Sequence, residues 1–319
     1  MLLAGMMVFS VAGCGAATVE GEAPAAKETE QEAPAEQPAA ETTEEAAEEQ
    51  TAGGGSVGLS VSTLNNPFFV TLVEGAQAEA DAQGMELIVV DAGDDAAKQA
   101  SDIEDLLSKN ISVLIVNPVD SDAVAPSVED AIAKNVGVIA VDRAVNGVEV
   151  DCSIASDNVA GAKMATEYLV ELVGEGAKVA ELQGVSGASA TIDRGEGFHQ
   201  VADEKLDVVS SQTANFNRSE GMTVMENMLQ ANPDIKGVFA HNDEMALGAV
   251  EAATDKDIII VGFDATDDAL AAVKEGKMAA TVAQQPDLMG KTAVDCAQKL
   301  LNGETVEKTM PVEVSLVKE

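Results

Sequence analysis

From Val57 onward, short runs of apolar residues alternate with amphipathic stretches of helical period. The runs are rich in Val and Ile, which is typical of strands that are buried on both faces of a parallel sheet. The strand candidates of the first half are Val57–Val61, Glu86–Asp91, Ser112–Val116, Val136–Val141 and Asp151–Ile154, with helical stretches near residues 67–83, 95–109 and 122–134. This alternation predicts a doubly wound α/β fold.

The same alternation restarts after about Asp157. The strand candidates of the second half are Lys178–Leu182, Val208–Gln212, Gly237–Ala240, Ile258–Val261 and Ala279–Val282. Since the chain has no Trp and few other aromatic residues, its core must consist mainly of aliphatic side chains. We therefore expect two similar α/β domains, each built on a parallel sheet.

A weak repeat of polar residues at the ends of strand candidates supports two related halves. In the first half a strand candidate leads into Asn117, and the next candidate ends at Val141 before Asp142. In the second half a strand candidate leads to Asn242, and the next is followed by Asp264. Ligands of open parallel sheets bind outside the carboxyl ends of the strands, so these positions are candidates for a binding site.

The N-terminus carries the features of a lipoprotein signal. The apolar run Leu2–Ala12 is too short to span a bilayer, and it ends in Val11-Ala12-Gly13-Cys14, which resembles a lipobox. We expect residues 1–14 to be the signal, with lipid attached to Cys14. One feature does not fit, because no Lys or Arg precedes the apolar run as it does in most secretory signals.

Residues 15–55 are rich in Ala, Glu, Pro and Thr and end in Gly53-Gly54-Gly55. Such a composition cannot form a core and predicts a disordered acidic tether. With a lipid at Cys14, the tether would hold the folded part near the outer face of the cell membrane, or in the periplasm if an outer membrane is present.

Charge and cysteine content exclude several functions. The formal net charge of -38 repels phosphate backbones, so nucleic acid is not an expected partner. The spacing of Cys14, Cys152 and Cys296 matches no metal site. Cys152 and Cys296 lie in apolar patterns, which favours buried free thiols and leaves a disulfide open. We expect no metal, no cofactor and no enzymatic activity, since His199 and His241 are isolated and no phosphate loop or nucleophile elbow is present.

The first strand leads into Asn66-Pro67-Phe68-Phe69. Asn before Pro predicts a helix start, with Asn66 as the N-cap. Phe69 lies on the apolar stripe of that helix and is a core candidate, whereas Phe68 lies off the stripe, where an aromatic ring can cover a ligand.

Other polar residues at predicted strand ends or in loops suit a sugar. Arg143 follows Asp142, Arg194 follows Asp193, and the planar guanidinium forks match vicinal hydroxyls, although surface ion pairs are an alternative. Sugars also present apolar C–H faces, which favours flat aromatic lids. Candidates of both kinds in the second half are Phe216, Asn242, Asp264 and Gln284.

From about Val57 to the C-terminus the chain resembles the ribose-binding proteins of bacterial ABC importers, members of the type I periplasmic binding protein family. The segments that carry the resemblance are Val61–Phe69, Asn117–Val124, Ile154–Val159, Gly174–Val185, Arg194–Phe198, Asn242–Ala249 and Val261–Asp264. The resemblance implies D-ribose as ligand, importer permease subunits as partners, and a monomer. The ribose contacts that it implies are Asn66, Phe68, Phe69, Asp142, Arg143, Arg194, Phe216, Asn242, Asp264 and Gln284, with Ser62 nearby.

The family fold implies two lobes with Rossmann-like parallel sheets, joined by three crossovers. The hinge residues implied are Ser156, Asp157, Gln284, Gln285, Glu313 and Val314. The N-terminal lobe is then expected to comprise residues 57–156 and 285–313, and the C-terminal lobe residues 157–284 and 314–319.

Departures from the family pattern are small. They are a shorter connection between Val250 and Ile258, His241 where Gln is common, and Asn217 where Asp is common. A related monosaccharide, such as allose or another pentose, is the alternative ligand. Glucose- and galactose-binding relatives use a Trp lid and a calcium loop, and this chain has no Trp. A sugar-responsive repressor shares the fold but needs a basic DNA-binding N-terminus, which is not found here.

Overall fold

The computed structural model describes residues 55–318, which all belong to one compact unit, Gln50–Glu319. Within them the strands form two six-stranded sheets with orders β11-β5-β4-β3-β1-β2 and β12-β10-β9-β8-β6-β7. The strands of the first sheet are β1 (Val57–Val61), β2 (Leu87–Asp91), β3 (Val113–Val116), β4 (Gly137–Val141), β5 (Cys152–Ser156) and β11 (Thr309–Val312). Those of the second sheet are β6 (Lys178–Gln183), β7 (Asp207–Thr213), β8 (Gly237–Ala240), β9 (Ile259–Asp264), β10 (Ala280–Ala283) and β12 (Ser315–Lys318).

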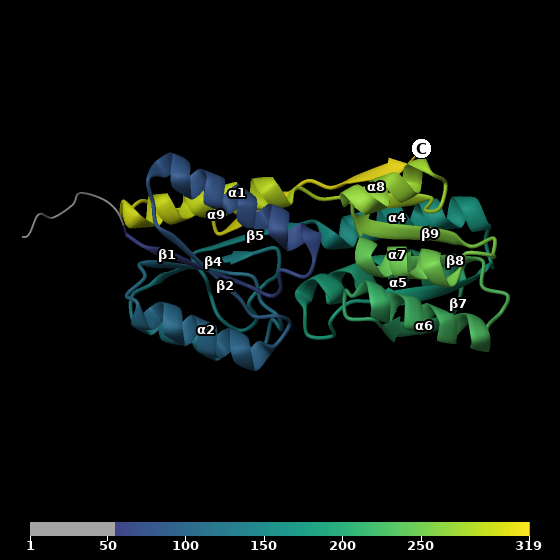
Figure 1. Cartoon of the computed structure of the whole chain (residues 1–319), viewed down its shortest axis with the longest axis horizontal. Coiled ribbons are helices and arrows are strands. Elements are labelled where there is room, and N and C mark those ends of the chain that lie inside the picture. The colour runs from purple at the N-terminus through teal and green to yellow at the C-terminus, as the bar shows by residue number, and fades with distance from the viewer. Residues whose placement is uncertain (1–54, 319) are drawn as a thin grey trace, which may run out of the picture. The chain divides into compact units, whose positions relative to one another are not determined.

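Helices cover both faces of each sheet. They are α1 (Pro67–Gln83), α2 (Ala96–Ser108), α3 (Ala125–Ala133), α4 (Asn158–Val173), α5 (Ser189–Lys205), α6 (Arg218–Ala231), α7 (Asp243–Ala252), α8 (Asp267–Lys274) and α9 (Pro286–Leu301). We call the first sheet with α1, α2, α3 and α9 the first lobe, and the second sheet with α4 to α8 the second lobe. Figure 1 shows α1 and α9 side by side on one face of the first sheet, with α2 on the other.

Four apolar clusters form the cores, two in each lobe. In the first lobe, α1 and α9 pack on one face of the sheet, and α2 and α3 on the other. In the second lobe, α4 and α5 cover one face, while α6, α7 and α8 cover the other. Because both faces are buried, the central strands are apolar along their whole length, as the sequence pattern predicts.

The predicted fold class is confirmed, with one addition. The sequence pattern did not reveal the edge strands β11 and β12, since the first contains Pro311 and both are largely exposed. The strand β12 pairs antiparallel with β10, so the second sheet is parallel except at this edge. The first-half helix near 67–83 is found at Pro67–Gln83, with Asn66 as its N-cap accepting a hydrogen bond from the Phe68 amide at 3.0 Å.

The chain passes between the two sheets three times, after β5, after β10 and between β11 and β12. The six predicted hinge residues all lie at these connections or at their edges. Two of the connections contact each other, because the side-chain amide of Gln285 donates to the Glu313 carbonyl at 3.0 Å.

Cys152 and Cys296 are buried free thiols. No helix among residues 55–318 is long and apolar enough to cross a membrane. The predicted signal, Cys14 and nearly all of the predicted tether lie outside the described residues.

Candidate functional site: a buried polar cavity between the lobes

A small cavity lies between the lobes, and its empty space amounts to about 230 Å³ including the part open to solvent. All ten predicted contact residues line it, together with Ala190, which the sequence did not single out. The residues from the first lobe are Asn66, Phe68, Phe69, Asp142 and Arg143, and those from the second lobe or the crossover are Ala190, Arg194, Phe216, Asn242, Asp264 and Gln284.

The topology explains why residues far apart in sequence meet. Asp142 directly follows β4, Asp264 ends β9, and Gln284 directly follows β10. These are carboxyl ends of neighbouring or facing parallel strands, where side chains of α/β sheets converge on ligands. The repeat seen in the sequence has a structural counterpart. Asn117 follows β3, which is adjacent to β4, and Asn242 follows β8, which is adjacent to β9.

The two first-lobe aromatics belong both to the core and to the cavity wall. Phe68 and Phe69 are buried in the core cluster under α1 and also line the cavity. Their rings meet edge to face, with centroids 5.1 Å apart. Asn66 has two contacts of interest: its Oδ1 caps the N-terminus of α1, and the residue also lines the cavity.

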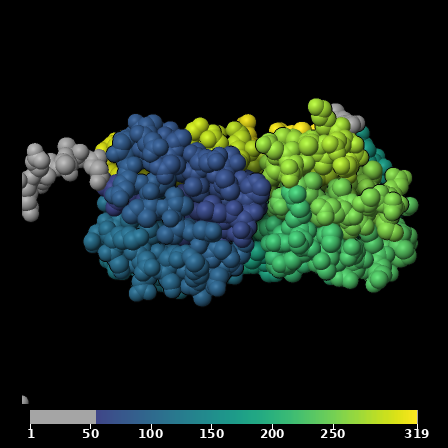
Figure 2. Space-filling view, viewed as in Figure 1, coloured from purple at the N-terminus to yellow at the C-terminus, as the bar shows by residue number. Residues whose placement is uncertain are grey.

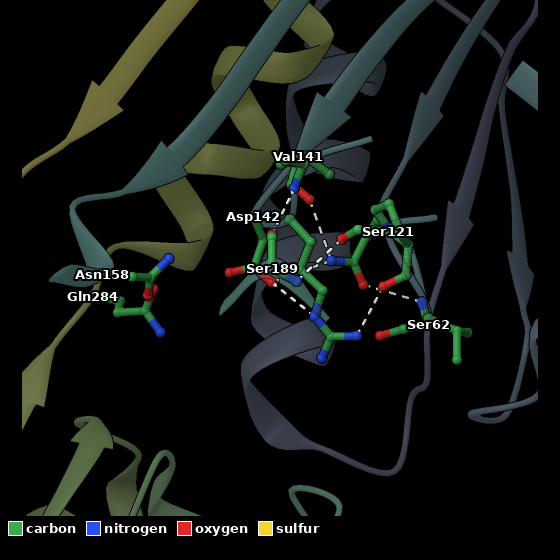
Figure 3. A network of polar contacts seen from close by, with 12 residues as sticks. Ser62, Ser121, Val141, Asp142, Asn158, Ser189 and Gln284 are labelled. Atoms are coloured by element: carbon green, nitrogen blue, oxygen red, sulfur yellow. Dashed lines mark hydrogen bonds and ion pairs between the residues drawn. The ribbon is translucent and has the colours of Figure 1, made fainter. Parts of the chain in front are cut away.

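Asp142, labelled in Figure 3, and Arg143 form the polar wall of the first lobe. Asn117 holds the Asp142 carboxylate, because its Nδ2 donates to Asp142 Oδ2 and to the Val141 carbonyl, each at 3.2 Å. Arg143 Nη1 donates to the Pro118 carbonyl at 2.8 Å. Arg143 Nε lies 3.7 Å from Asp142 Oδ2 and has no hydrogen-bond partner among the described residues, so this donor stays free.

Arg194, Asp264 and Gln284 form the facing wall. Arg194 Nε donates to Asn158 Oδ1 at 2.9 Å, and its Nη1 lies 3.8 Å from Asp264 Oδ1. Gln284 Nε2 donates to Asp264 Oδ1 at 2.6 Å, while Gln284 Oε1 has no partner among residues 55–318. The Arg194 guanidinium lies 3.9 Å from the centre of the Phe263 ring, which fixes its plane.

Phe216 lies in the loop between β7 and α6 and is largely buried. Its side chain is only 9% exposed and packs in a core cluster of the second lobe. Gly184 makes this possible, because a Cβ at that position would collide with the Phe216 ring. The Arg143 guanidinium, from the other lobe, lies 5.2 Å from the ring centre. Asn242 completes this side, with its Oδ1 capping α7 through the Met245 amide at 3.0 Å.

Burial sets the electrostatics of the cavity. It raises the pKa of Asp142 above its ordinary value, although Arg143, Arg194 and the Asn117 hydrogen bond act in the opposite direction. It raises the pKa of Asp264 further, although Arg194 opposes the shift. Burial likewise lowers the pKa of Arg143 and Arg194, against the effect of the carboxylates. The four charges thus lie in a poorly solvated space in loose pairs, and their hydrogen-bonding capacity is not used up.

The backbone is also strained around the cavity. Asp142, Phe216 and Asp264 have positive φ values of 65°, 57° and 124°, a region that costs non-glycine residues about 1–3 kcal/mol. Such strain is typical of positions where the surrounding fold dictates the direction of a functional side chain.

The two lobes touch beside the cavity. The Ser121 amide donates to the Gly187 carbonyl at 2.9 Å, and the Ser189 amide donates to Ser121 Oγ at 3.1 Å. The Ala144 amide in turn donates to Ser189 Oγ at 2.9 Å. Figure 2 shows atoms of the first lobe, in blue, meeting atoms of the second lobe, in green, along one seam. The described arrangement is therefore a closed one.

Taken together, the cavity offers carboxylate acceptors, guanidinium and amide donors, and aromatic faces, all in a buried space reached from two lobes. A neutral solute with many hydroxyl groups matches these groups, because each hydroxyl both donates and accepts. Two α/β lobes that enclose such a site define a solute-binding protein.

Comparison with known proteins agrees with this class. Residues 57–305 match the family model "Periplasmic binding protein domain", and the chain belongs to this family of solute-binding transport proteins. The family resemblance predicted from the sequence is confirmed. Membership places the chain outside the cytoplasmic membrane.

Relatives and solved structures resemble the chain over most of its length. The Ribose import binding protein RbsB of Bacillus subtilis is 53% identical over 82% of this chain and 86% of its own. Its namesake from Escherichia coli is 50% identical over 82% of this chain and 90% of its own. A solute binding protein of an ABC transporter from Bacillus halodurans, solved with bound myo-inositol, has a TM-score of 0.80 and 35% identity, covering 84% of this chain and 96% of its own.

Sequence reasoning missed several residues that shape the cavity. Ala190 carries no polar group that could have marked it. Asn158 was not singled out by the sequence, and only the structure shows that its Oδ1 accepts a hydrogen bond from Arg194 Nε. Asn117 was noted as part of the internal repeat, but only the structure shows that it holds Asp142.

Proposed function

We propose that this chain captures D-ribose in the cavity between its lobes and delivers it to the permease subunits of an ABC importer. The observation that carries the proposal is the convergence of ten polar and aromatic residues, predicted as ribose contacts, on one buried cavity. The relatives that share about half of its residues, and carry ribose import in their names, support the same ligand.

The ligand contacts proposed are Asn66, Phe68, Phe69, Asp142, Arg143, Arg194, Phe216, Asn242, Asp264 and Gln284. Ionised carboxylates of Asp142 and Asp264 accept hydrogen bonds from sugar hydroxyls, and the free Arg143 Nε donates to a hydroxyl oxygen. The Phe rings cover the C–H faces and exclude water. A bound sugar would therefore satisfy buried groups that the protein leaves unpaired.

Capture involves closure of the lobes. A ligand that contacts both lobes binds the closed form better than the open one and shifts the equilibrium toward it. We propose as hinge the residues Ser156, Asp157, Gln284, Gln285, Glu313 and Val314, with the lobe boundaries given in the sequence analysis. The direct contacts of Ser121 with Gly187 and Ser189 would then form only on closure.

A related monosaccharide, such as allose or another pentose, is the second candidate, because a structural neighbour with 35% identity holds a different polyol, myo-inositol. Titration calorimetry against ribose, allose, other pentoses and glucose distinguishes them. We expect ribose to bind with a Kd of about 1 μM or tighter, on the order of -8 kcal/mol. Equal affinity for ribose and glucose would reject the assignment, and tighter binding of allose would replace ribose by the alternative.

The N-terminal features complete the proposal. Lipid at Cys14 anchors the chain to the outer face of the cell membrane, and the acidic tether lets the folded part move between solution and permease. The folded part acts as a monomer, and it needs no nucleic acid, metal or cofactor.

A further inference from the structure

Behind the cavity lies a buried carboxylate that does not line it. Glu181, in the central strand β6, is fully buried. Its Oε1 lies 2.9 Å from His241 Nε2, and its Oε2 accepts from Gln183 Nε2 at 2.9 Å and lies 3.4 Å from His199 Nε2. A buried carboxylate costs several kcal/mol unless it is well paired, so a role for these partners is to be expected.

The ring of His241 makes one specific contact. It is fully buried, and its Nδ1 has no hydrogen-bond partner within the described part of the chain. Burial lowers the pKa of His241, although Glu181 opposes the shift, and this favours the neutral ring. A neutral ring whose Nε2 faces a carboxylate carries its hydrogen on Nε2, and this N–H donates a hydrogen bond to Glu181 Oε1. The imidazole thus serves as a fixed link between β8 and β6.

The main chain of His241 reaches the cavity. Its carbonyl accepts a hydrogen bond from Arg194 Nη1 at 2.5 Å, and its amide donates to the Leu182 carbonyl of β6 at 2.9 Å. Strand β6 therefore holds His241 twice, through the backbone at Leu182 and through the ring at Glu181. This double attachment sets the direction of the carbonyl that receives Arg194.

Helix α5 lies directly on the pair. A Cβ added at Gly195, the residue after Arg194, would lie 3.6 Å from His241 Cε1 and 3.7 Å from Glu181 Oε1. No side chain therefore separates this turn of α5 from the pair. The His241 carbonyl thus holds the Arg194 guanidinium, and the next residue of α5, Gly195, lies against the pair.

We infer that the Glu181–His241 pair is a positioning device that holds Arg194 in the orientation required for sugar binding. The inference rests on the proposed function and adds to it two residues that do not contact the sugar. It implies that ribose affinity depends on a hydrogen-bond donor at position 241, and that this dependence acts through Arg194.

Calorimetry with ribose tests the inference. His241→Leu keeps the volume but removes the donor, and we expect the Kd to rise roughly tenfold to a hundredfold, the effect of a lost hydrogen bond to a charged group. His241→Gln supplies an amide donor and should bind within about threefold of wild type. His199→Gln is the matched control, because it alters the other imidazole that lies near Glu181. His199 does not hydrogen-bond Arg194, so this variant should bind ribose like wild type.

A double-mutant cycle separates positioning from a general loss of structure. In an Arg194→Ala background, His241→Leu should change the Kd less than about twofold, since the residue through which it acts is gone. If His241→Leu does not fold, Glu181→Leu combined with His241→Leu also removes the buried charge and should show the same loss and the same coupling.

The outcomes distinguish the two proposals. Wild type that binds no ribose rejects the proposed function, and the inference with it. Wild type that binds ribose, while the folded Leu variant binds equally well or its effect simply adds to that of Arg194→Ala, overturns the positioning role alone. Failure of His241→Gln to restore affinity overturns it as well.

Discussion

Replacing Asp142 by Ala should separate ribose affinity from stability. The carboxylate is buried, receives one side-chain hydrogen bond from Asn117 at 3.2 Å, and is only loosely paired with Arg143 at 3.7 Å. Its remaining lone pairs face the cavity that we assign to the sugar. The variant removes this acceptor and leaves Arg143 without its neighbouring charge.

The size of the effect follows from these contacts. A hydrogen bond to a charged group contributes about 1.5–3 kcal/mol, and truncating one partner of a buried charged pair costs about 2–5 kcal/mol in binding. Since the pair with Arg143 is long, we take the lower part of the second range. The expected loss is about 2–4 kcal/mol, or roughly thirtyfold to a thousandfold in Kd.

Removing the charge of Asp142 should not destabilise the sugar-free protein, although it weakens sugar binding. Burial raises the pKa of Asp142 in the folded state. A carboxyl group with a raised pKa contributes stability below its unfolded pKa and loses that contribution as the pH rises through the folded pKa. At neutral pH the ionised group is therefore a cost to the fold, and Asp142→Asn, which keeps the shape, should melt at the same temperature as wild type or higher.

Calorimetry with ribose and thermal melts without sugar measure both effects on the same samples. Asp105→Ala, which removes an exposed carboxylate from α2, is the control for the change in net charge and should match wild type in both assays. Ribose binding by Asp142→Ala within about threefold of wild type, a change well below the predicted range, would refute the reasoning. So would a loss of affinity in Asp142→Asn that is accompanied by a large fall in Tm.

Three further predictions concern pH, closure and anchoring. Burial raises the pKa of Asp264 well above its ordinary value, so on acidification ribose affinity should fall at a higher pH than it would with an ordinary carboxylate. An affinity that calorimetry finds unchanged from pH 7 to about pH 5 would contradict the role of Asp264 as an ionised acceptor for the sugar. A Cβ at Gly187 would collide with the Asp120 carboxylate of the other lobe. Gly187→Ala should therefore weaken ribose binding and reduce the sugar-induced compaction seen in small-angle scattering, without lowering the Tm of the sugar-free protein. Unchanged ribose affinity would speak against closure at this contact between the lobes. Full-length protein should partition with membranes and Cys14→Ala should release it, whereas equal soluble fractions would reject the lipid anchor.

The regular part of the fold could be predicted because parallel strands buried on both faces need unbroken apolar runs. Candidates such as Val57–Val61 and Gly237–Ala240 coincide with β1 and β8. The strands β11 and β12 could not be found this way, since an edge strand is half solvated and its residues carry no apolar run. Their pairing partners lie far away in sequence, at β5 and β10, and are set by the tertiary fold.

The cavity could be anticipated where polar residues end apolar strands, as with Asp142 and Asp264. It could not be anticipated where a residue acts by its small size, as Ala190 does. The place of Phe216 at the cavity was predicted, but the polar loop around it gave no sign that its ring is also part of a core cluster. Glu181 also escaped notice, because a Glu within a strand is usually a residue of the solvent-facing side. Only the tertiary structure shows that its side chain meets His241 inside the second lobe.

We propose that ribose lies between the lobes in contact with both. A crystal structure of the protein grown with an equimolar amount of ribose tests it most directly. We expect one sugar in the cavity, with hydroxyl oxygens within about 3.2 Å of Asp142 and Arg143 on one side and of Arg194 and Asp264 on the other. A cavity that stays empty of sugar, or a sugar held by one lobe alone, would contradict it.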